Sequence, residues 1–236
     1  MQVKEEVTKD VDFAAGQLLL VDKPLGWTSF DVVNKIRYSL RPAKIKVGHA
    51  GTLDPLATGL LIICTGKFTK KIDLYQAEAK EYTGVITLGA TTPSFDLETE
   101  VNERFDMSRL TEDDIHTAAQ TFVGDITQLP PVHSAIKQQG ERIYEKARRG
   151  ETVTVHPRPV TIFEFEITEV NLPDVSFRVT CSKGTYIRSL ANDLGQKLNC
   201  GGHLTSLRRT ASGSFTVENA WQVDDLVTHI KSMNQE

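Results

Sequence analysis

Hydrophobic and polar residues follow different spacings along this chain, and these spacings predict its secondary structure. Short apolar or alternating runs predict strands at residues 17–22, 60–64, 82–88, 153–170, 175–182, 204–210 and 214–217. Helical patterns are found at about residues 28–40, 67–77, 111–122, 185–198 and 223–230. Because strands and helices are mixed without a regular βαβ alternation, we expect an α+β domain with a mainly antiparallel central sheet flanked by helices.

Two of the helices begin with the same polar signal. Thr28 is followed by Asp31, and Thr111 by Asp114, which is the spacing of a capping box with Asp in the acidic position. The expected apolar stripe of the first helix consists of Phe30, Val33, Ile36 and Leu40.

Polar stretches between these elements predict loops. Residues 41–46 form a basic loop, residues 91–107 an acidic surface loop, and residues 142–149 a basic helical turn. Residues 128–137 contain a Pro-Pro pair and one short predicted strand.

The composition is that of an ordinary soluble globular protein, with 39% hydrophobic and 25% charged residues in a chain of 236. This length fits one large domain or two small ones. No apolar run is long enough to span a bilayer. Residues 1–15 are charged, lack the apolar stretch of a secretory signal and are expected to be flexible, so a cytoplasmic location is predicted.

Charge and cysteine content narrow the possible functions only slightly. The net charge of −4 argues against a protein that is basic all over, but nucleic-acid binding requires only a local basic face. Basic residues are concentrated at 41–46, 67–71 and 142–149. The three cysteines are widely spaced, which disfavours a disulfide framework. Cys200 and His203 have a spacing that occurs in metal sites, but the sequence has no second such pair, so no metal is expected.

Residues 48–59 are the stretch best suited to chemistry. Their glycines permit positive φ and close approach of a ligand, and Pro55 fixes the chain direction directly after Asp54. Asp before Pro is also a common turn starter, so the residues alone leave a catalytic and a turn-forming role equally open. Phosphate-binding loops and a serine nucleophile elbow are absent from the sequence, and a hydrolase triad of Asp54 with His49 is disfavoured because nothing marks a serine partner.

Five motifs, in order along the chain, resemble those of the TruB-type tRNA pseudouridine synthases. Residues 20–26 resemble the first motif, residues 48–59 the catalytic segment, and residues 80–82 the strand that carries the substrate tyrosine. The family's RNA-gripping insertion is resembled by residues 130–137 with Gly140, Tyr144, Ala147 and Arg148. The last motifs are resembled by residues 181–188, Leu194, Gly195 and residues 207–209.

The resemblance implies a pseudouridine-synthase-like fold, with one catalytic domain at residues 16–236 and the RNA-gripping insertion at about residues 128–152. It also implies isomerisation of uridine to pseudouridine in the T-loop of tRNA, at tRNA position 55. The glycosidic bond moves from N1 to C5 without redox change or an outside group donor, so no cofactor is expected. Many family members carry a C-terminal PUA domain; ten residues follow Leu226 here, so we expect the form without it.

The family's catalytic residues can be carried over to this sequence. The catalytic aspartate falls on Asp54, which is ionised at neutral pH because an ordinary Asp has a pKa of ~3.9. Arg188 matches the arginine that pairs with this aspartate and so retains its charge. Tyr82 matches the tyrosine that stacks on the target base and assists proton removal from C5. Whether Asp54 attacks C1′ or C6, and which group takes the C5 proton, stays open.

Substrate-binding positions follow in the same way. His49 matches the histidine that holds the bent RNA loop after the base is flipped. Tyr186 and Leu207 match further substrate contacts, and Lys23 and Pro24 match residues that line the pocket, where Lys23 supports rather than reacts. For each of these residues, ordinary packing or surface exposure is the alternative interpretation.

The resemblance makes the T-arm of tRNA the expected partner of a monomeric enzyme that does not act at a membrane. The target base must be flipped out of the folded loop, and phosphate contacts offset the cost of this step. Affinity should therefore weaken with salt. Candidate phosphate contacts are Lys44, Lys46, Lys67, Lys70, Lys71, Lys137, Arg142, Lys146, Arg148 and Arg149.

Two other functions are alternatives to a tRNA pseudouridine synthase. One is a non-catalytic RNA-binding or RNA-folding protein on the same scaffold, and the other is a small-molecule hydrolase. The presence of Asp54, Tyr82 and Arg188 together favours the synthase.

Overall fold

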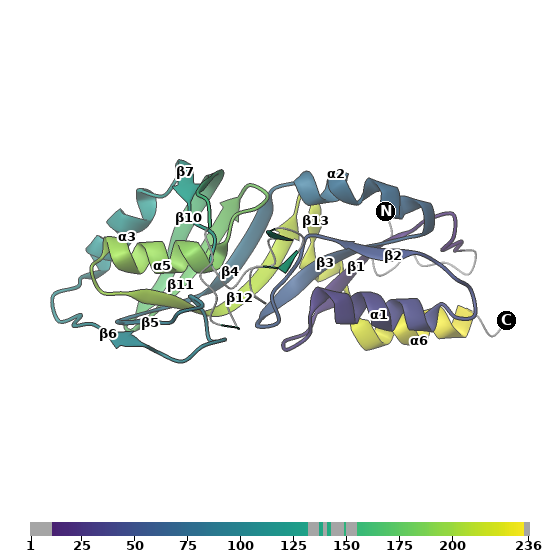
Figure 1. The fold of residues 1–236 in the computed structure, drawn as a ribbon, viewed down its shortest axis with the longest axis horizontal. Coiled ribbons are helices and arrows are strands. Elements are labelled where there is room, and N and C mark those ends of the chain that lie inside the picture. Colours follow the sequence, from purple (N-terminus) through teal and green to yellow (C-terminus); the bar gives the residue numbers. More distant parts are fainter. Residues whose placement is uncertain (1–10, 132–136, 139–140, 143–148, 150–154, 234–236) are drawn as a thin grey trace. The chain divides into compact units, whose positions relative to one another are not determined.

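The computed structural model describes residues 11–131, 137–138, 141–142, 149 and 155–233, and the chain within it divides into two compact units (Figure 1). Unit 1 comprises Met1–Tyr82 and Leu207–Glu236, and unit 2 comprises Thr83–Ser206. Strands β4 (Lys80–Leu88) and β12 (Gly202–Ser212) contribute residues to both units.

Strand β3 (Ala57–Thr65) is the centre of unit 1. It pairs antiparallel with β1 (Leu18–Lys23) and β2 (Val47–Ala50), and parallel with residues 207–209 of β12. The remaining elements of the unit are the strands β13 (Phe215–Thr216) and β14 (Trp221–Gln222), the helices α1 (Ser29–Ser39), α2 (Ile72–Ala77) and α6 (Val223–Met233), and the 3-10 helices η1 (Gly66–Lys71) and η2 (Val217–Asn219).

The alternation of side chains along β1 and β3 produces two cores in unit 1. Leu19, Val21, Leu61 and Ile63 point to one face and pack with apolar residues of α1 and α6. On the other face, Leu18, Leu20, Leu60 and Ile62 pack with residues of η1, α2 and the segment after β13. Because both faces of β3 are covered, its sequence is a continuous apolar run rather than an alternating one.

Unit 2 is built around strands β10 (Arg158–Asn171) and β11 (Asp174–Cys181). β10 pairs antiparallel with β11 and with β7 (Gly124–Gln128). Phe165 of β10 packs edge to face on Phe177, with ring centroids 5.9 Å apart. Among the described residues, unit 2 also contains the strands β5 (Ala90–Thr91), β6 (Glu103–Arg104), β8 (Lys137–Gln138) and β9 (Glu141–Arg142), and the helices α3 (Glu112–Gln120) and α5 (Ile187–Lys197).

The predicted fold class is confirmed, since most strand pairs are antiparallel and helices accompany the strands in both units. Both predicted capping boxes are present, at Thr28 and at Thr111, and each accepts a hydrogen bond from the backbone N–H three residues on. Both helices begin where the sequence predicts, because a capping box involves only residues of the first turn.

Two predictions are wrong. Phe30 is 58% exposed and does not belong to the buried stripe of α1, which is formed by Val32, Val33, Ile36 and Leu40. The segment at 91–107 is not simply a surface loop, because the side chains of Ser94 and Asp96 within it are buried. The predicted helical turn at 142–149 falls largely on residues 143–148, outside the described residues.

Gly59, at the start of β3, should be intolerant of any side chain. Its φ is +103°, and a Cβ there would lie 2.2 Å from the carbonyl oxygen of Arg209 on β12. Gly26 is the matched control, because its φ is +80° but nothing lies within 4 Å of a Cβ. Positive φ alone costs about 1–2 kcal/mol for a residue with a Cβ.

We therefore predict that Gly26→Ala lowers the free energy of unfolding by about 1 kcal/mol, and Gly59→Ala by more than about 3 kcal/mol. Urea unfolding of the two variants measures both values. Equal losses would show that the close pairing of β3 with β12 does not constrain Gly59.

Candidate active site

Asp54 lies half-buried in unit 1, in the loop between β2 and β3. Its carbonyl oxygen accepts a hydrogen bond from the N–H of Ala57 at 3.0 Å, with Pro55 second in this turn. The turn-forming role considered from the sequence is thus present. It uses the backbone of Asp54, so it is compatible with a chemical role for the carboxylate.

The peptide before Asp54 is fixed by Ser29, the first residue of α1. The Oγ of Ser29 accepts from the N–H of Leu53 at 2.9 Å and donates to the carbonyl oxygen of Leu53 at 3.2 Å. Ser29 and Leu53 are both buried. The start of α1, set by its capping box, therefore determines where the residue before Asp54 lies.

The peptide after Asp54 is held by hydrogen bonds from residues 20–26, the first of the sequence motifs. The carbonyl oxygen of Pro55 accepts from the N–H of Gly26 at 2.8 Å, and the Nζ of Lys23 lies 3.5 Å from the same oxygen. Both neighbours of Asp54 are consequently held by hydrogen bonds from segments distant in sequence, which restricts the directions its side chain can take.

Arg209 connects the two ends of this loop. Its buried guanidinium donates from Nε to the carbonyl oxygen of Leu60 at 2.6 Å and from Nη2 to that of Gly51 at 3.1 Å. Gly51 follows β2 and Leu60 lies within β3. One side chain thus sets the spacing of the strands from which the loop with Asp54 emerges.

Lys23 is fully buried at the end of β1. Its Nζ donates to the carbonyl oxygens of Trp27 at 2.5 Å and Pro24 at 3.0 Å. Burial lowers the pKa of Lys23 to about 8; the negative charge of Asp54 raises it, and the positive charge of Arg209 lowers it further. At neutral pH Lys23 is therefore mostly protonated, and its charge favours the ionised form of Asp54.

His49 lies on β2 opposite Ile63 of β3. Burial, and next the positive charge of Arg209, lower the pKa of His49, while the backbone of Gly51 acts in the opposite direction. The imidazole is therefore neutral at pH 7. Its buried Nδ1 has no hydrogen-bond partner among the described residues. His49 is thus a half-buried strand residue rather than an ordinary surface histidine.

Three other predicted site residues belong to unit 1. Leu207 of β12 pairs with Ala57, the residue that closes the turn from Asp54, so it lies beside the loop. Tyr82 is buried on β4, with 9% of its surface exposed. Pro24 is half-buried directly after β1.

Arg188 lies in the first turn of α5 in unit 2, with a buried side chain. Its Nη1 is 3.4 Å from the Oδ2 of Asp96 and donates to the carbonyl oxygen of Ser94 at 3.4 Å. The other carboxylate oxygen of Asp96 accepts from the N–H of Glu98 at 2.9 Å. A buried ion pair of this kind orients the guanidinium, because leaving either charge alone would be costly.

Tyr186 is the N-cap residue of α5, two positions before Arg188. The guanidinium of Arg158 lies over the Tyr186 ring at 4.4 Å from its centroid and also donates to the carbonyl oxygen of Gly184. Tyr186 and Arg188 are thus neighbours within unit 2. The pairing of Arg188 with Asp54 stays a prediction, since the two residues belong to different units.

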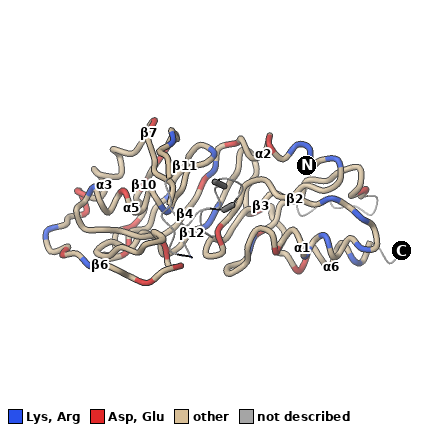
Figure 2. Tube along the Cα trace, in the orientation of Figure 1, with Lys and Arg blue, Asp and Glu red and all other residues tan. Residues whose placement is uncertain are grey.

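Two basic stretches of the sequence come together in unit 1. The N–H of Gly66 donates to the carbonyl oxygen of Lys46 at 2.9 Å, so that η1 continues beside the start of β2. Figure 2 marks lysine and arginine positions on both stretches. The exposed lysines there are Lys44, Lys46, Lys67, Lys70 and Lys71. In unit 2, Lys137 pairs with Arg142 across the β8–β9 hairpin, whereas Lys146 and Arg148 lie outside the described residues.

The cysteine and histidine considered as a metal pair contact the backbone instead. The Nδ1 of His203 lies 3.1 Å from the carbonyl oxygen of Ala90, and the Cys200 thiol lies 3.5 Å from that of Gly201. In the part of the chain that the structure describes, His, Cys, Asp and Glu form no group of three suited to a metal ion. The helices described there include none with the length and hydropathy needed to cross a membrane.

Sequence reasoning did not identify Ser29 and Arg209 as residues that hold the loop of Asp54, or Asp96 as the partner of Arg188. Arg209 belongs to the last motif of the resemblance, but no role was predicted for it. Asp96 was placed among surface acids, because the burial of its loop carries no local signal. Ser29 was not distinguished from any other residue at the start of a helix.

Comparison with known families decides the identity. The N-terminal domain of the TruB family of pseudouridylate synthases matches residues 37–187, and the C-terminal domain of tRNA pseudouridylate synthase B matches residues 188–236. The chain belongs to the TruB family. Pseudouridine synthases are isomerases, so this TruB-family chain is an enzyme of that class.

Relatives within the family are similar along most of their length. The tRNA pseudouridine synthase B of Flavobacterium johnsoniae is 57% identical over 214 residues, which cover 89% of this chain and 93% of the relative. That of Phocaeicola vulgatus is 52% identical over 218 residues, covering 91% of this chain and 93% of the relative.

Solved structures confirm the TruB-like fold. A chain in the crystal structure of a Cbf5-Nop10-Gar1 complex matches with a TM-score of 0.72 and 31% identity over 96% of this chain. A chain in the structure of an H/ACA RNP bound to a substrate RNA containing 2′-deoxyuridine matches with a TM-score of 0.69 and 29% identity over 92% of this chain. The TruB-family chain spans 57% and 54% of these two chains.

The buried ammonium of Lys23 gives the TruB-family enzyme a pH-dependent stability. The folded pKa of about 8 lies below the unfolded value of 10.5, so between these pH values the unfolded chain binds more protons. The free energy of unfolding contributed by this group therefore rises with pH in that window and is constant below it.

We predict that, from pH 7.5 to 9.5, wild type gains about 1–2 kcal/mol of unfolding free energy relative to Lys23→Met. Urea unfolding of both proteins at the two pH values measures the difference, because all other titrating groups cancel. If the two proteins change in parallel, Lys23 does not titrate in this range.

Proposed function

We propose that this TruB-family enzyme isomerises uridine to pseudouridine in the T-loop of tRNA, at tRNA position 55. The observation that carries the proposal is Asp54, a carboxylate on a loop whose neighbouring peptides are fixed at Leu53 and Pro55. It is supported by 57% identity to a protein named tRNA pseudouridine synthase B. We further propose that the enzyme acts as a single chain on cytoplasmic tRNA.

The reaction requires one bond to break and one to form. The bond between N1 of uracil and C1′ of ribose breaks, a bond between C5 and C1′ forms, the proton of C5 leaves and N1 gains a proton. We assign Asp54 as the nucleophile that assists this exchange, at C1′ or at C6. Such a group needs retained charge and a fixed direction more than an activating base. The hydrogen bonds on both sides of Asp54 supply direction, and Lys23 supplies positive charge.

Arg188 is proposed to pair with Asp54 in the reacting complex. A guanidinium has five N–H donors in a fixed planar arrangement. Donors arranged in one plane let a guanidinium contact Asp96 and Ser94 while it also binds a second carboxylate. The contact of Nη1 with Asp96 restricts the directions that the guanidinium can take, so that a second carboxylate would meet a partly oriented partner.

The remaining predicted residues are proposed to hold the flipped nucleotide and the RNA around it. Tyr82 would stack on the base and assist removal of the C5 proton. His49, with a neutral imidazole, would hold the bent RNA loop. Tyr186 and Leu207 would contact the substrate. Lys23 and Pro24 would line the pocket. The basic stretches around β2 and η1 would bind phosphates of the T-arm.

A direct test is to incubate the enzyme with an unmodified tRNA transcript and to map pseudouridine along it. We expect one pseudouridine, at the T-loop uridine of position 55. A matched transcript with cytidine at this position should yield none, because cytidine keeps the ribose and base shape but is not the substrate base.

Two outcomes would overturn the proposal. Pseudouridine at other positions alone would contradict the T-loop assignment. Tight binding of the transcript without any pseudouridine would contradict the enzymatic role and favour a non-catalytic RNA-binding protein on this scaffold.

A further inference from the structure

We propose that Gln128 is a positioning residue for the reaction, which fixes the N-terminus of α5 and with it Arg188 and Tyr186. The inference rests on the proposed roles of these two residues. Gln128 does not take part in the chemical step itself. Its proposed role is to position other residues of unit 2.

The side chain of Gln128 makes two hydrogen bonds to one distant residue. Gln128 ends β7 and is fully buried. Its Oε1 accepts from the backbone N–H of Tyr186 at 2.7 Å, and its Nε2 donates to the carbonyl oxygen of Tyr186 at 2.9 Å. A carboxamide bonded in this way holds both the position and the tilt of the backbone at Tyr186.

The start of α5 depends on such an outside partner. Tyr186 is its N-cap residue, and no side chain caps the helix from that position. The next anchor comes from the neighbour of Gln128, because the Oγ of Ser189 donates to the carbonyl oxygen of Leu129 at 2.8 Å. Residues 128 and 129 thus bond to α5 on both sides of Arg188.

The ring of Tyr186 is held from the adjacent strand. Arg158 of β10 pairs in register with Gln128 of β7. Its guanidinium lies over the Tyr186 ring, 4.4 Å from the centroid. Gln128 therefore fixes the backbone of Tyr186 while Arg158 fixes its ring, and both act from the same end of the β7–β10 pair.

The position of the first turn of α5 determines where the guanidinium of Arg188 lies. This guanidinium contacts Asp96 and Ser94 at 3.4 Å, which is a long distance for such bonds. A small shift of the first turn of α5 would therefore change these contacts. Misplacement by about 1 Å can slow a reaction by a factor of the order of 100.

Gln128 also lies at a junction in the sequence. It immediately precedes Leu129, Pro130 and the stretch that resembles the RNA-gripping insertion. The same short segment thus begins that stretch and bonds to the helix with Arg188.

A merely structural role for Gln128 makes a different prediction. Loss of a satisfied buried amide would lower stability, but the folded enzyme would retain its rate. Loss of a positioning residue would slow the chemical step in enzyme that is folded and has tRNA bound. The rate at saturating tRNA separates the two.

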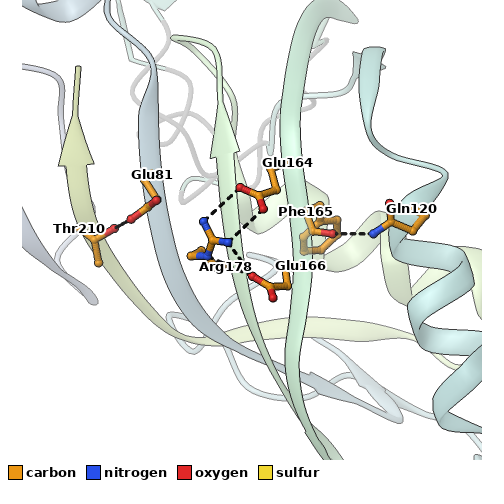
Figure 3. A network of polar contacts seen from close by, with 7 residues as sticks. All are labelled: Glu81, Gln120, Glu164, Phe165, Glu166, Arg178 and Thr210. Carbon is orange, nitrogen blue, oxygen red and sulfur yellow. Dashed lines mark hydrogen bonds and ion pairs between the residues drawn. The ribbon is translucent and has the colours of Figure 1, made fainter. Parts of the chain in front are cut away.

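The test compares Gln128→Leu with Gln120→Leu, a change at an exposed glutamine, both in the 236-residue chain. Gln120 also belongs to unit 2, and its Nε2 donates to the carbonyl oxygen of Phe165 at 3.2 Å (Figure 3). Single-turnover conversion of tRNA at saturating enzyme, the dissociation constant for tRNA and the melting temperature are measured for each. We expect Gln128→Leu to lose about tenfold or more in rate with affinity changed less than about threefold, and Gln120→Leu to retain its rate.

Gln128→Glu provides a second, independent readout. An ionised carboxylate accepts from the N–H of Tyr186 but cannot donate to its carbonyl oxygen, whereas a protonated one does both. The rate of this variant relative to wild type should therefore rise as the pH is lowered. This variant also decides the question if Gln128→Leu does not fold.

Equal rates for Gln128→Leu and wild type, or a Gln128→Glu to wild-type ratio that does not change with pH, would overturn the positioning role. An inactive wild-type enzyme would instead overturn the proposed function. The two failures are distinguishable because every rate is compared with that of wild type.

Discussion

The loop from Gly51 to Asp54 lies outside helices and strands, so its backbone polar groups must find partners elsewhere. Ser29 supplies both bonds to Leu53, Gly26 bonds to Pro55, and Arg209 bonds to Gly51. The start of α1, the end of β1 and the register of β12 on β3 are all required for these bonds. The architecture of unit 1 can therefore be understood as the support of one short loop.

Some of the side chains that hold the loop of Asp54 are buried cations. Lys23 and Arg209 are both buried, and both direct their N–H groups to backbone carbonyl oxygens. Carbonyl oxygens offset part of the desolvation cost while leaving the positive charges uncancelled. The field that remains favours an ionised carboxylate at Asp54. In unit 2, Arg188 is buried beside Asp96, so each unit contains a buried cation whose partners fix its direction.

Local signals were sufficient for much of the fold. The capping boxes at Thr28 and Thr111 and the apolar run of β3 were predicted because each depends on residues close in sequence. Contacts between distant residues were not predictable in this way. The guanidinium of Arg209 bonds to a residue 158 positions away, and no pattern marks such a pair. The site residues came from the family resemblance, and the roles assigned to them await experiment.

The central claim is that the carboxylate of Asp54 performs the chemistry. The most direct measurement is single-turnover conversion of tRNA by Asp54→Asn, with tRNA affinity and melting temperature measured in parallel. Asn keeps the shape of the side chain and leaves the backbone bonds of the loop in place, but it removes the charge and the nucleophile. We predict no pseudouridine above background with tRNA still bound, and conversion at the wild-type rate would contradict a chemical role for the Asp54 carboxylate.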